Sequence, residues 1–428
     1  MKRITFVFPK VGWKFERTPY PPLGIGYLAA ILIRDGWDVS IIDGQILEQR
    51  EYERRLQEVT EGIVGISASI RQIEEALRVA SLLKRNNSKI PILLGGPGVS
   101  VFELYPEKIR DVDVIIKGEA EKDIVQILNN LQRGSSSSQH PQTIICTNPV
   151  NLDELPYPAR ELFPLERYLE IWRKNTGMSS TSVISSRGCP FGCLFCDKHI
   201  SGWKFRSRSS KNVVDEMEYL AGRYKLDDIF FYDDLFVFDR ARVIEICREI
   251  KKRKLDVAWS AQARVDRIDE EMLQEMKDAG CRELYFGVES GSDRILRYLR
   301  KGFTRKKIIE AFKISHKIGI RPGMYLILGI PGETREDIED TKNLIRECRP
   351  YLLNFSYLMP FPGTPLFEET KQWIKSYNFS EWDEMRESIY SFPFEVKPGQ
   401  AHDEIYQVFQ EMVKEGMECS SLQFCCDQ

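Results

Sequence analysis

The chain has 428 residues, 42% of them hydrophobic, which is enough for two domains with separate cores. Its 61 Lys and Arg residues nearly balance 64 Asp and Glu residues, and the formal net charge of −3 argues against a nucleic-acid partner. No apolar stretch reaches the length of a membrane-spanning helix, and the first residues lead directly into a strand pattern, so we expect neither a membrane span nor a signal peptide.

Short apolar runs alternate with amphipathic segments up to about residue 130. The amphipathic segments predict helices, notably at Leu23–Asp35 and Gln72–Arg85. Continuous Val, Ile and Leu runs that alternate with helices are typical of a parallel sheet covered on both faces, so we predict an α/β domain with a doubly wound, Rossmann-like sheet. The expected strands are Ile4–Phe8, Asp38–Ile42, Ile63–Ser67, Ile92–Leu94 and Val114–Ile116.

The periodicity fails between about Gln132 and Ile171. The serine run at 135–138 indicates a flexible break, and Leu155–Arg160, with two prolines, indicates an extended linker. We therefore divide the chain into a first domain, a linker, a second domain and a small helical C-terminal region, with bounds at 1–135, 136–175, 176–370 and 371–428.

A second alternation of strand and helix patterns begins at Thr181 and predicts a partial (β/α)6 barrel, whose functional residues would follow the carboxyl ends of its strands. The expected strands are Ser182–Ser185, Ile229–Tyr232, Val257–Ser260, Glu283–Val288, Met324–Leu328 and Leu353–Leu358. The expected helices are Val213–Tyr224, Arg240–Lys252, Glu270–Asp278, Arg305–Ile318 and Glu336–Arg346.

Three cysteines follow the first of these strands within eight residues: Cys189, Cys193 and Cys196, in a C-x3-C-x2-C pattern. Three thiolates can bind three irons of a [4Fe–4S] cluster and leave the fourth iron open to a substrate. The alternatives are a zinc knuckle or three unrelated buried thiols. Zinc requires a fourth ligand, and the nearest donor, His199, has no familiar zinc spacing. We expect a loop histidine at that position to be packed or solvated.

This cysteine loop, with Phe195 before its last cysteine and a strand before its first, resembles the radical S-adenosylmethionine (SAM) superfamily. The resemblance implies that the open iron binds the methionine part of SAM. An electron from the cluster then cleaves SAM and releases a 5′-deoxyadenosyl radical.

Later barrel strands end in polar or Gly-rich signatures that match SAM-binding positions of this superfamily. Asp233 and Asp234 could accept a hydrogen bond from the ammonium group of SAM, or could merely cap a turn. Arg264 could bind the carboxylate of SAM, or form a structural salt bridge. The resemblance also implies contacts from Glu289 and Ser290 to the ribose of SAM. The absence of a side chain at Gly329 would let the adenine of SAM approach the backbone.

The first domain looks like the cobalamin-binding domain that is fused to many radical SAM enzymes, and the resemblance covers about residues 3–370. Small residues at the carboxyl edge of the sheet would leave room for a flat corrin. The residues that carry this resemblance are Pro22, Leu23, Gly24, Ser67, Gly95, Gly96, Gly118 and Glu119.

Two departures from the cobalamin pattern concern histidines. The Asp-x-His-x-x-Gly motif is absent and no His precedes His140, so the first domain cannot supply a histidine below the cobalt. Gly98 stands where relatives often have His. The alternative to a cobalamin site is a domain that has lost the cofactor and only gates the barrel.

The resemblance implies a cytoplasmic, oxygen-sensitive, cobalamin-dependent radical SAM enzyme that methylates an unactivated carbon. Ring closure or oxidation, as in anaerobic Mg-protoporphyrin ester cyclases, stays open. A tRNA methylthiotransferase would require a second cysteine triad, and no cysteine precedes Cys146. A non-enzymatic iron–sulfur sensor would not cleave SAM.

The expected substrate is a lipid, a tetrapyrrole, a natural-product precursor or a peptide, and the expected electron donor is a flavodoxin or ferredoxin. Ten cysteines with three held as thiolates fit a reducing cytoplasm rather than a disulfide framework. For Cys419, Cys425 and Cys426 we expect incidental thiols at a frayed terminus.

Overall fold

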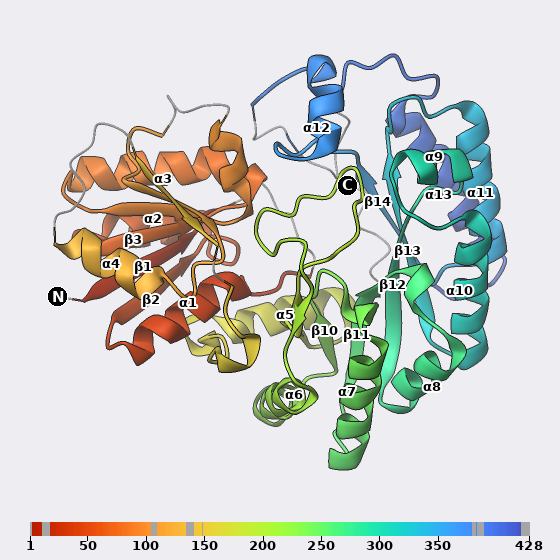
Figure 1. Cartoon of the computed structure of the whole chain (residues 1–428), viewed down its shortest axis with the longest axis horizontal. Helices are drawn as coiled ribbons and strands as arrows, with labels where there is room; N and C mark the ends of the chain where they lie inside the picture. The colour runs from red at the N-terminus through yellow and green to blue at the C-terminus, as the bar shows by residue number, and fades with distance from the viewer. Residues whose placement is uncertain are drawn as a thin grey trace. The chain divides into compact units, whose positions relative to one another are not determined.

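The computed structural model describes residues 2–10, 18–103, 109–133, 141–147, 149–378, 382 and 389–420 (Figure 1). The serine run, His140, Cys425 and Cys426 lie outside these residues. The chain forms two compact units. The N-terminal unit contains Met1–Ile171, Lys198–Ser201 and Ser376–Trp382, and the barrel unit contains Trp172–Asp197, Gly202–Lys375 and Asp383–Gln428.

The N-terminal unit is built on a parallel sheet of strand order β2-β1-β3-β4-β5-β6, which confirms the predicted doubly wound fold. Its strands are β1 (Arg3–Phe8), β2 (Asp38–Asp43), β3 (Ile63–Ser67), β4 (Ile92–Gly95), β5 (Val114–Gly118) and β6 (Gln142–Cys146). Its helices are α1 (Leu23–Arg34), α2 (Gln49–Gln57), α3 (Ile73–Asn86), α4 (Ile124–Gln132) and α5 (Leu165–Thr176), the last of which runs into the barrel unit.

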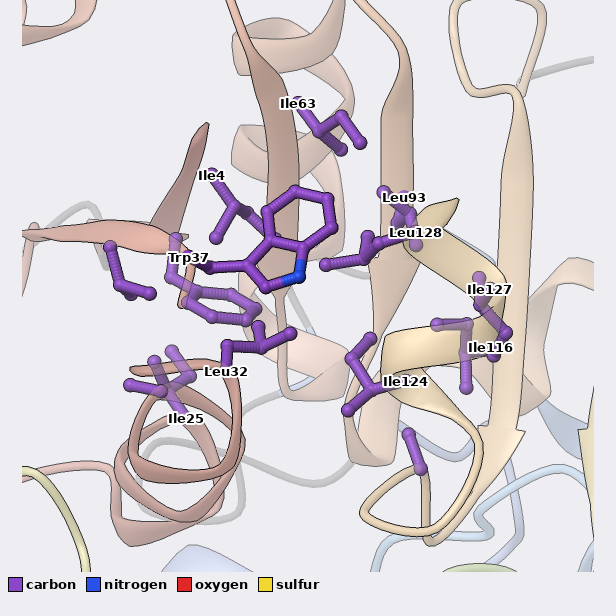
Figure 2. Packing of buried hydrophobic residues seen from close by; sticks show 14 of the residues in the cluster. Ile4, Ile25, Leu32, Trp37, Ile63, Leu93, Ile116, Ile124, Ile127 and Leu128 are labelled. Carbon is purple, nitrogen blue, oxygen red and sulfur yellow. The ribbon is translucent and has the colours of Figure 1, made fainter. Parts of the chain in front are cut away.

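One face of this sheet packs on α1 and α4 through a single hydrophobic cluster. Figure 2 shows Trp37 inside it, with Leu32 of α1 and Ile124 of α4 on the same side of the strands. Trp37 is 4% exposed and Leu32 is fully buried. Burial of such side chains contributes about 1.5–3 kcal/mol each, so this cluster is a main source of stability for the sheet.

The sheet continues past the predicted domain boundary at residue 135, because Gln142–Cys146 pairs with β5 as the edge strand β6. Its first four residues are exposed or half-buried, and Ile145 is 66% exposed. An edge strand that buries so few side chains has only a weak apolar pattern, which is why the sequence indicated a linker there.

The barrel unit contains a curled parallel sheet of strand order β14-β13-β12-β11-β10-β7, which confirms the predicted partial barrel (Figure 1). The strands of this unit are β7 (Ser180–Val183), β8 (Ser186–Arg187), β9 (Arg206–Ser207), β10 (Asp228–Phe231), β11 (Ala258–Ala263), β12 (Cys281–Glu289), β13 (Arg321–Leu328) and β14 (Leu352–Tyr357). Its helices are α6 (Ser210–Tyr224), α7 (Arg240–Arg253), α8 (Glu270–Asp278), α9 (Asp293–Tyr298), α10 (Arg305–Ile318), α11 (Arg335–Cys348), α12 (Pro365–Thr370) and α13 (Pro398–Lys414).

The two faces of the curled sheet differ in chemistry. The face that packs on the helices is apolar, and there Phe286 of β12 contacts Phe312 of α10 with ring centroids 5.5 Å apart. On the opposite face, Gln262 is in register with Tyr285, whose hydroxyl donates to Glu283. Because strand side chains alternate between faces, this second face carries polar and aromatic side chains without interrupting the core.

No helix among the described residues is long and apolar enough to cross a membrane.

Candidate functional site

The cysteine loop is held at its base by a short antiparallel ribbon, in which Ser186 of β8 pairs with Ser207 of β9. Inside the loop, the backbone N–H of Cys189 donates to the carbonyl of Gly202. Leu194 is 1% exposed in a hydrophobic cluster of the barrel unit, and its N–H donates to Leu299. The loop that carries the three cysteines is therefore anchored at both ends and in the middle.

The thiols of this loop differ from other cysteines of the barrel unit. Cys193 and Cys196 are half-buried and Cys189 is 8% exposed, and none of the cysteines that the structure describes forms a disulfide. By contrast, burial raises the pKa of Cys247 and of Cys348 to about 12, which makes both poor metal ligands.

Within the described ranges, no three His, Cys, Asp or Glu side chains are grouped as a single metal ion would require. A four-iron cluster does not need that grouping, because each thiolate binds a different iron. The donor set of the loop thus suits a cluster better than a zinc ion, which takes four ligands on one centre.

Asp233 lies at the carboxyl end of β10 and supports the segment before the cysteine loop. Its carboxylate accepts hydrogen bonds from the N–H and Oγ of Ser185 and from Oγ of Ser186, at 2.5–2.6 Å. Asp233 is 2% exposed, and burial raises the pKa of its carboxyl, although the positive charge of Arg242 acts to lower that pKa. Asp234 is exposed and accepts a hydrogen bond from the N–H of Gly188 at 2.6 Å. The two adjacent carboxylates therefore both bind the entry to the loop, but only Asp234 faces solvent.

Arg264 follows β11 and is 6% exposed. Its Nε and Nη2 donate to the two carboxylate oxygens of Asp266 at 3.0 and 3.1 Å. Nη2 also donates to the carbonyl of Lys301 at 2.6 Å, and Nη1 lies 3.8 Å from Sγ of Cys193. This geometry shows the salt bridge, which is one of the two roles that the sequence offered.

Glu289 ends β12 and forms a buried ion pair with Lys301, with Oε1 and Nζ 2.8 Å apart. Its φ of 71° is in the left-handed region, which costs a non-glycine residue about 1–3 kcal/mol. Sequence reasoning missed Lys301, because a lysine before a glycine is usually a solvated turn residue. Only the fold brings it, 4% exposed, beside Glu289 and over the ring of Phe195 at 5.7 Å.

Ser290 and Gly329 also lie at the carboxyl edge of the sheet. Ser290 is 1% exposed, and its Oγ accepts the N–H of Ser292 in the turn that leads to α9. Gly329 follows β13 with a φ of 75°, a conformation that favours glycine. The structure thus brings the predicted residues Asp234, Glu289, Ser290 and Gly329 to the ends of three strands of one sheet.

Glu333, four residues after Gly329, was not singled out by the sequence. It is 7% exposed, and burial raises the pKa of its carboxyl to about 8, assisted by the charge of Asp337 and opposed by backbone hydrogen bonds from Gly329 and Ile330.

We expect Glu333→Gln to stabilise the protein at alkaline pH only. Because the pKa is raised in the folded state, the parent loses stability as the pH rises from the unfolded value of 4.5 to about 8, by roughly 1.4 kcal/mol per pH unit. Unfolding curves at about pH 3.5 and about pH 9, roughly one unit outside that window on each side, should coincide at the first pH and separate at the second. The exposed Glu336→Gln is the matched control, and an equal effect in both variants contradicts the assignment.

In the N-terminal unit, five of the eight residues expected to bind cobalamin lie at the carboxyl ends of three adjacent strands. Ser67 is the last residue of β3, and Gly118 is the last residue of β5. Gly95 is the last residue of β4, and Gly96 follows it. The side chain of Gln72 joins the first of these loops to the loop after β1, because it accepts from the N–H of Ser69 and donates to the carbonyl of Pro9. Ligands of doubly wound sheets bind beyond this edge, near the point where the strand order reverses.

Close backbone approach explains the glycines at this edge. A Cβ at Gly96, whose φ is 91°, would lie 2.8 Å from the backbone of Ala68, and a Cβ at Gly98 would lie 2.6 Å from the carbonyl of Ser69. The absence of a histidine at Gly98 therefore has a packing cause. Glu119 is 8% exposed, whereas Gly24 is exposed in the first turn of α1, after Pro22 and Leu23, with no neighbour within 4 Å of its added Cβ.

Two family models match the chain. The model of the radical SAM superfamily matches residues 183–345, and that of the B12 binding domain matches residues 17–128. An uncharacterized methyltransferase of Pyrococcus horikoshii is 32% identical over 388 residues, which are 86% of this chain and 82% of that protein. The chain belongs to the radical SAM enzymes that carry a B12-binding domain.

Two further comparisons agree with this family. The anaerobic magnesium-protoporphyrin IX monomethyl ester cyclase of Rubrivivax gelatinosus is 27% identical over 412 residues, which are 89% of this chain and 72% of the cyclase. The structure of TsrM, a radical SAM methyltransferase from Kitasatospora setae, matches with a TM-score of 0.71 and 19% identity, over 87% of this chain and 76% of that one. At that identity the likeness is one of fold.

A radical SAM domain implies a [4Fe–4S] cluster and SAM, and a B12-binding domain implies cobalamin. The residues present fit these groups. The radical SAM domain offers three thiols on one anchored loop, and Arg264, 3.8 Å from Cys193, supplies positive charge beside a set of thiolates. The B12-binding domain offers an edge where the backbones of Gly96 and Gly98 lie against those of Ala68 and Ser69, with no side chain on either glycine.

Proposed function

We propose that this radical SAM enzyme methylates an unactivated carbon of a small-molecule substrate with the help of cobalamin. The anchored three-thiol loop at the carboxyl edge of the barrel sheet carries the proposal, since the spacing of its thiols leaves one iron of a four-iron cluster for SAM. When bound, the cluster supplies the electron that cleaves SAM, and cobalamin supplies the methyl group.

We assign Cys189, Cys193 and Cys196 as the ligands of the cluster. Phe195, which stands between the last two in the sequence, packs against the hydrophobic cluster that contains Leu194. The exposed carboxylate of Asp234 supports a contact with the ammonium group of SAM. Asp233, which already accepts three hydrogen bonds, acts on SAM only by holding the start of the loop.

Glu289 and Ser290 are assigned to the ribose and Gly329 to the adenine. All three follow or end strands β12 and β13, which are neighbours in the sheet. The ion pair with Lys301 holds the carboxylate of Glu289 in place, at a residue whose backbone φ of 71° is unfavourable for a non-glycine. Lys301 therefore orients the contact of Glu289 with the ribose.

For the N-terminal part we propose that residues 1–135 bind cobalamin at the loops after β3, β4 and β5. Residues 136–175, which also supply the edge strand β6, connect the domains, and 176–370 and 371–428 form the catalytic barrel and its C-terminal region. The approach of Gly96 and Gly98 to the loop after β3 supports the first assignment, because it leaves backbone rather than side chains at the edge.

Cyclisation or oxidation is the second candidate reaction. It is favoured by the 27% identity to a magnesium-protoporphyrin ester cyclase over 89% of the chain. Uptake of methyl from labelled SAM separates the two, because a cyclase adds no methyl group to its product.

We further propose a cytoplasmic location and a flavodoxin or ferredoxin as electron donor. The absence of disulfides among the described cysteines supports a reducing compartment.

The test of the function uses anaerobically reconstituted protein, excess cobalamin, a strong reductant and SAM labelled in its methyl group. We expect 5′-deoxyadenosine to form, and label to enter a small molecule of a cell extract only when cobalamin is present. Product formation without label would support the cyclase, and no SAM cleavage at all would contradict both candidates.

The cobalamin site is expected to lack a histidine below the cobalt, because no His precedes His140 in the sequence. Electron paramagnetic resonance of the Co(II) form, bound to the full chain, should show cobalt lines without splitting by a coordinating nitrogen. Nitrogen splitting that is present in the parent protein and absent in the His199→Ala variant would identify a ligand from outside the first domain. That result would contradict the prediction.

A further inference from the structure

The guanidinium of Arg264 has a fixed orientation. Asp266 accepts from Nε and Nη2, so both oxygens of the carboxylate hold the plane of the group. The carbonyl of Lys301 takes a second bond from Nη2. Phe191, from the cysteine loop itself, covers the guanidinium with its ring centroid 3.7 Å from Cζ. These contacts leave Nη1 to point at Cys193, whose Sγ is 3.8 Å away.

This orientation matters because the charge is buried. Arg264 is 6% exposed, so water and salt screen its field less than they would at the surface. A hydrogen bond to a cluster thiolate, and a positive charge beside it, stabilise the reduced cluster more than the oxidised one, because reduction adds negative charge. Asp266 carries the opposite charge on the far side of the same group and weakens that effect.

We propose that Arg264 is a positioning residue that raises the reduction potential of the cluster through an Nη1–H···Sγ hydrogen bond to Cys193, and that Asp266 both aims this bond and limits its effect. The proposal rests on the assignment of Cys193 as a cluster ligand. It gives Arg264 a role in electron uptake by the enzyme, separate from the binding of SAM.

The test is a potentiometric titration of the reconstituted cluster in the full chain, followed by electron paramagnetic resonance in the absence of SAM. Arg264→Gln should shift the midpoint potential to a more negative value, and Arg264→Lys should restore part of the shift. Asp266→Asn removes the negative charge but keeps an amide oxygen that can still accept from the guanidinium, so it should shift the midpoint potential to a less negative value. Arg267→Gln is the matched control, since Arg267 is exposed and lies over the same Phe191 ring at 4.9 Å. The midpoint potential of the cluster in this variant should equal that of the parent.

Opposite shifts in the Arg264 and Asp266 variants support the proposal, because a purely structural pair would lose cluster content in both variants without opposite shifts. Equal potentials in parent and Arg264→Gln, or shifts of the same sign, overturn it. If Arg264→Gln fails to hold a cluster, the sign of the Asp266→Asn shift decides alone. A parent protein that holds no cluster would contradict the cysteine assignment instead, so the two failures are distinguishable.

Discussion

Replacing Cys189, Cys193 and Cys196 together by alanine is expected to leave a folded protein with no four-iron cluster and no cleavage of SAM. The three side chains lie on a loop whose anchors are backbone hydrogen bonds and Leu194, so the loop should survive their loss. Iron and sulfide content, the absorbance near about 400 nm typical of thiolate-bound clusters, and 5′-deoxyadenosine formation should all fall to background.

The control for this variant is Cys247→Ala combined with Cys348→Ala. Both cysteines are buried on α7 and α11, and burial raises their thiol pKa to about 12. This double variant should keep a full cluster, with a stability loss of about 1 kcal/mol per removed thiol. A cluster retained in the triple variant, or lost in the control, would show that the ligands lie elsewhere.

Asp233→Ala should strongly destabilise the barrel unit and prevent cluster assembly. The substitution removes the acceptor of three hydrogen bonds and the counter-charge of the buried Arg242. Removing one partner from a buried charged network costs about 3–5 kcal/mol. Urea unfolding of the apo-protein measures the loss, followed by tryptophan fluorescence, to which Trp259, buried in the same sheet, contributes.

Asp234→Ala is the matched control, because the same residue type stands at the next position with one backbone partner and an exposed carboxylate. Its cost should be about 1 kcal/mol. If the two variants unfold at the same urea concentration, Asp233 does not support the loop as described. If only Asp234→Ala weakens SAM binding at full cluster content, the division of roles between the two carboxylates is supported.

All but one of the strands of the two six-stranded sheets could be predicted, because their signal is local. Ile63–Ser67 and the helix Glu270–Asp278 were predicted with the observed bounds, since continuous apolar runs and a 3.6-residue period depend only on neighbouring residues. The two-residue strands β8 and β9 were missed because two residues carry no periodicity. Edge strand β6 was missed because only one of its five residues is buried, so its apolar pattern is weak.

The partners of the site residues could not be predicted, because they depend on contacts between distant segments. Asp233 was placed near SAM by its position after a strand, but which donors it meets depends on Ser185, 48 residues earlier in the sequence. The pair of Glu289 and Lys301 depends in the same way on the turn after α9. Position at the end of a strand was therefore predictable, whereas hydrogen-bonding role was not.

The alternation of side chains across the barrel sheet has a consequence for how such an enzyme changes during evolution. Phe286 and its apolar neighbours secure the helices, while Gln262 and Tyr285 on the other face take no part in that packing. Substitutions on the second face therefore leave the contacts between strands and helices in place, although a residue such as Tyr285, which stacks on Tyr325 at 5.8 Å, also packs within that face. Two classes of mutation, those that set stability and those that set specificity, are interleaved residue by residue along the same strands.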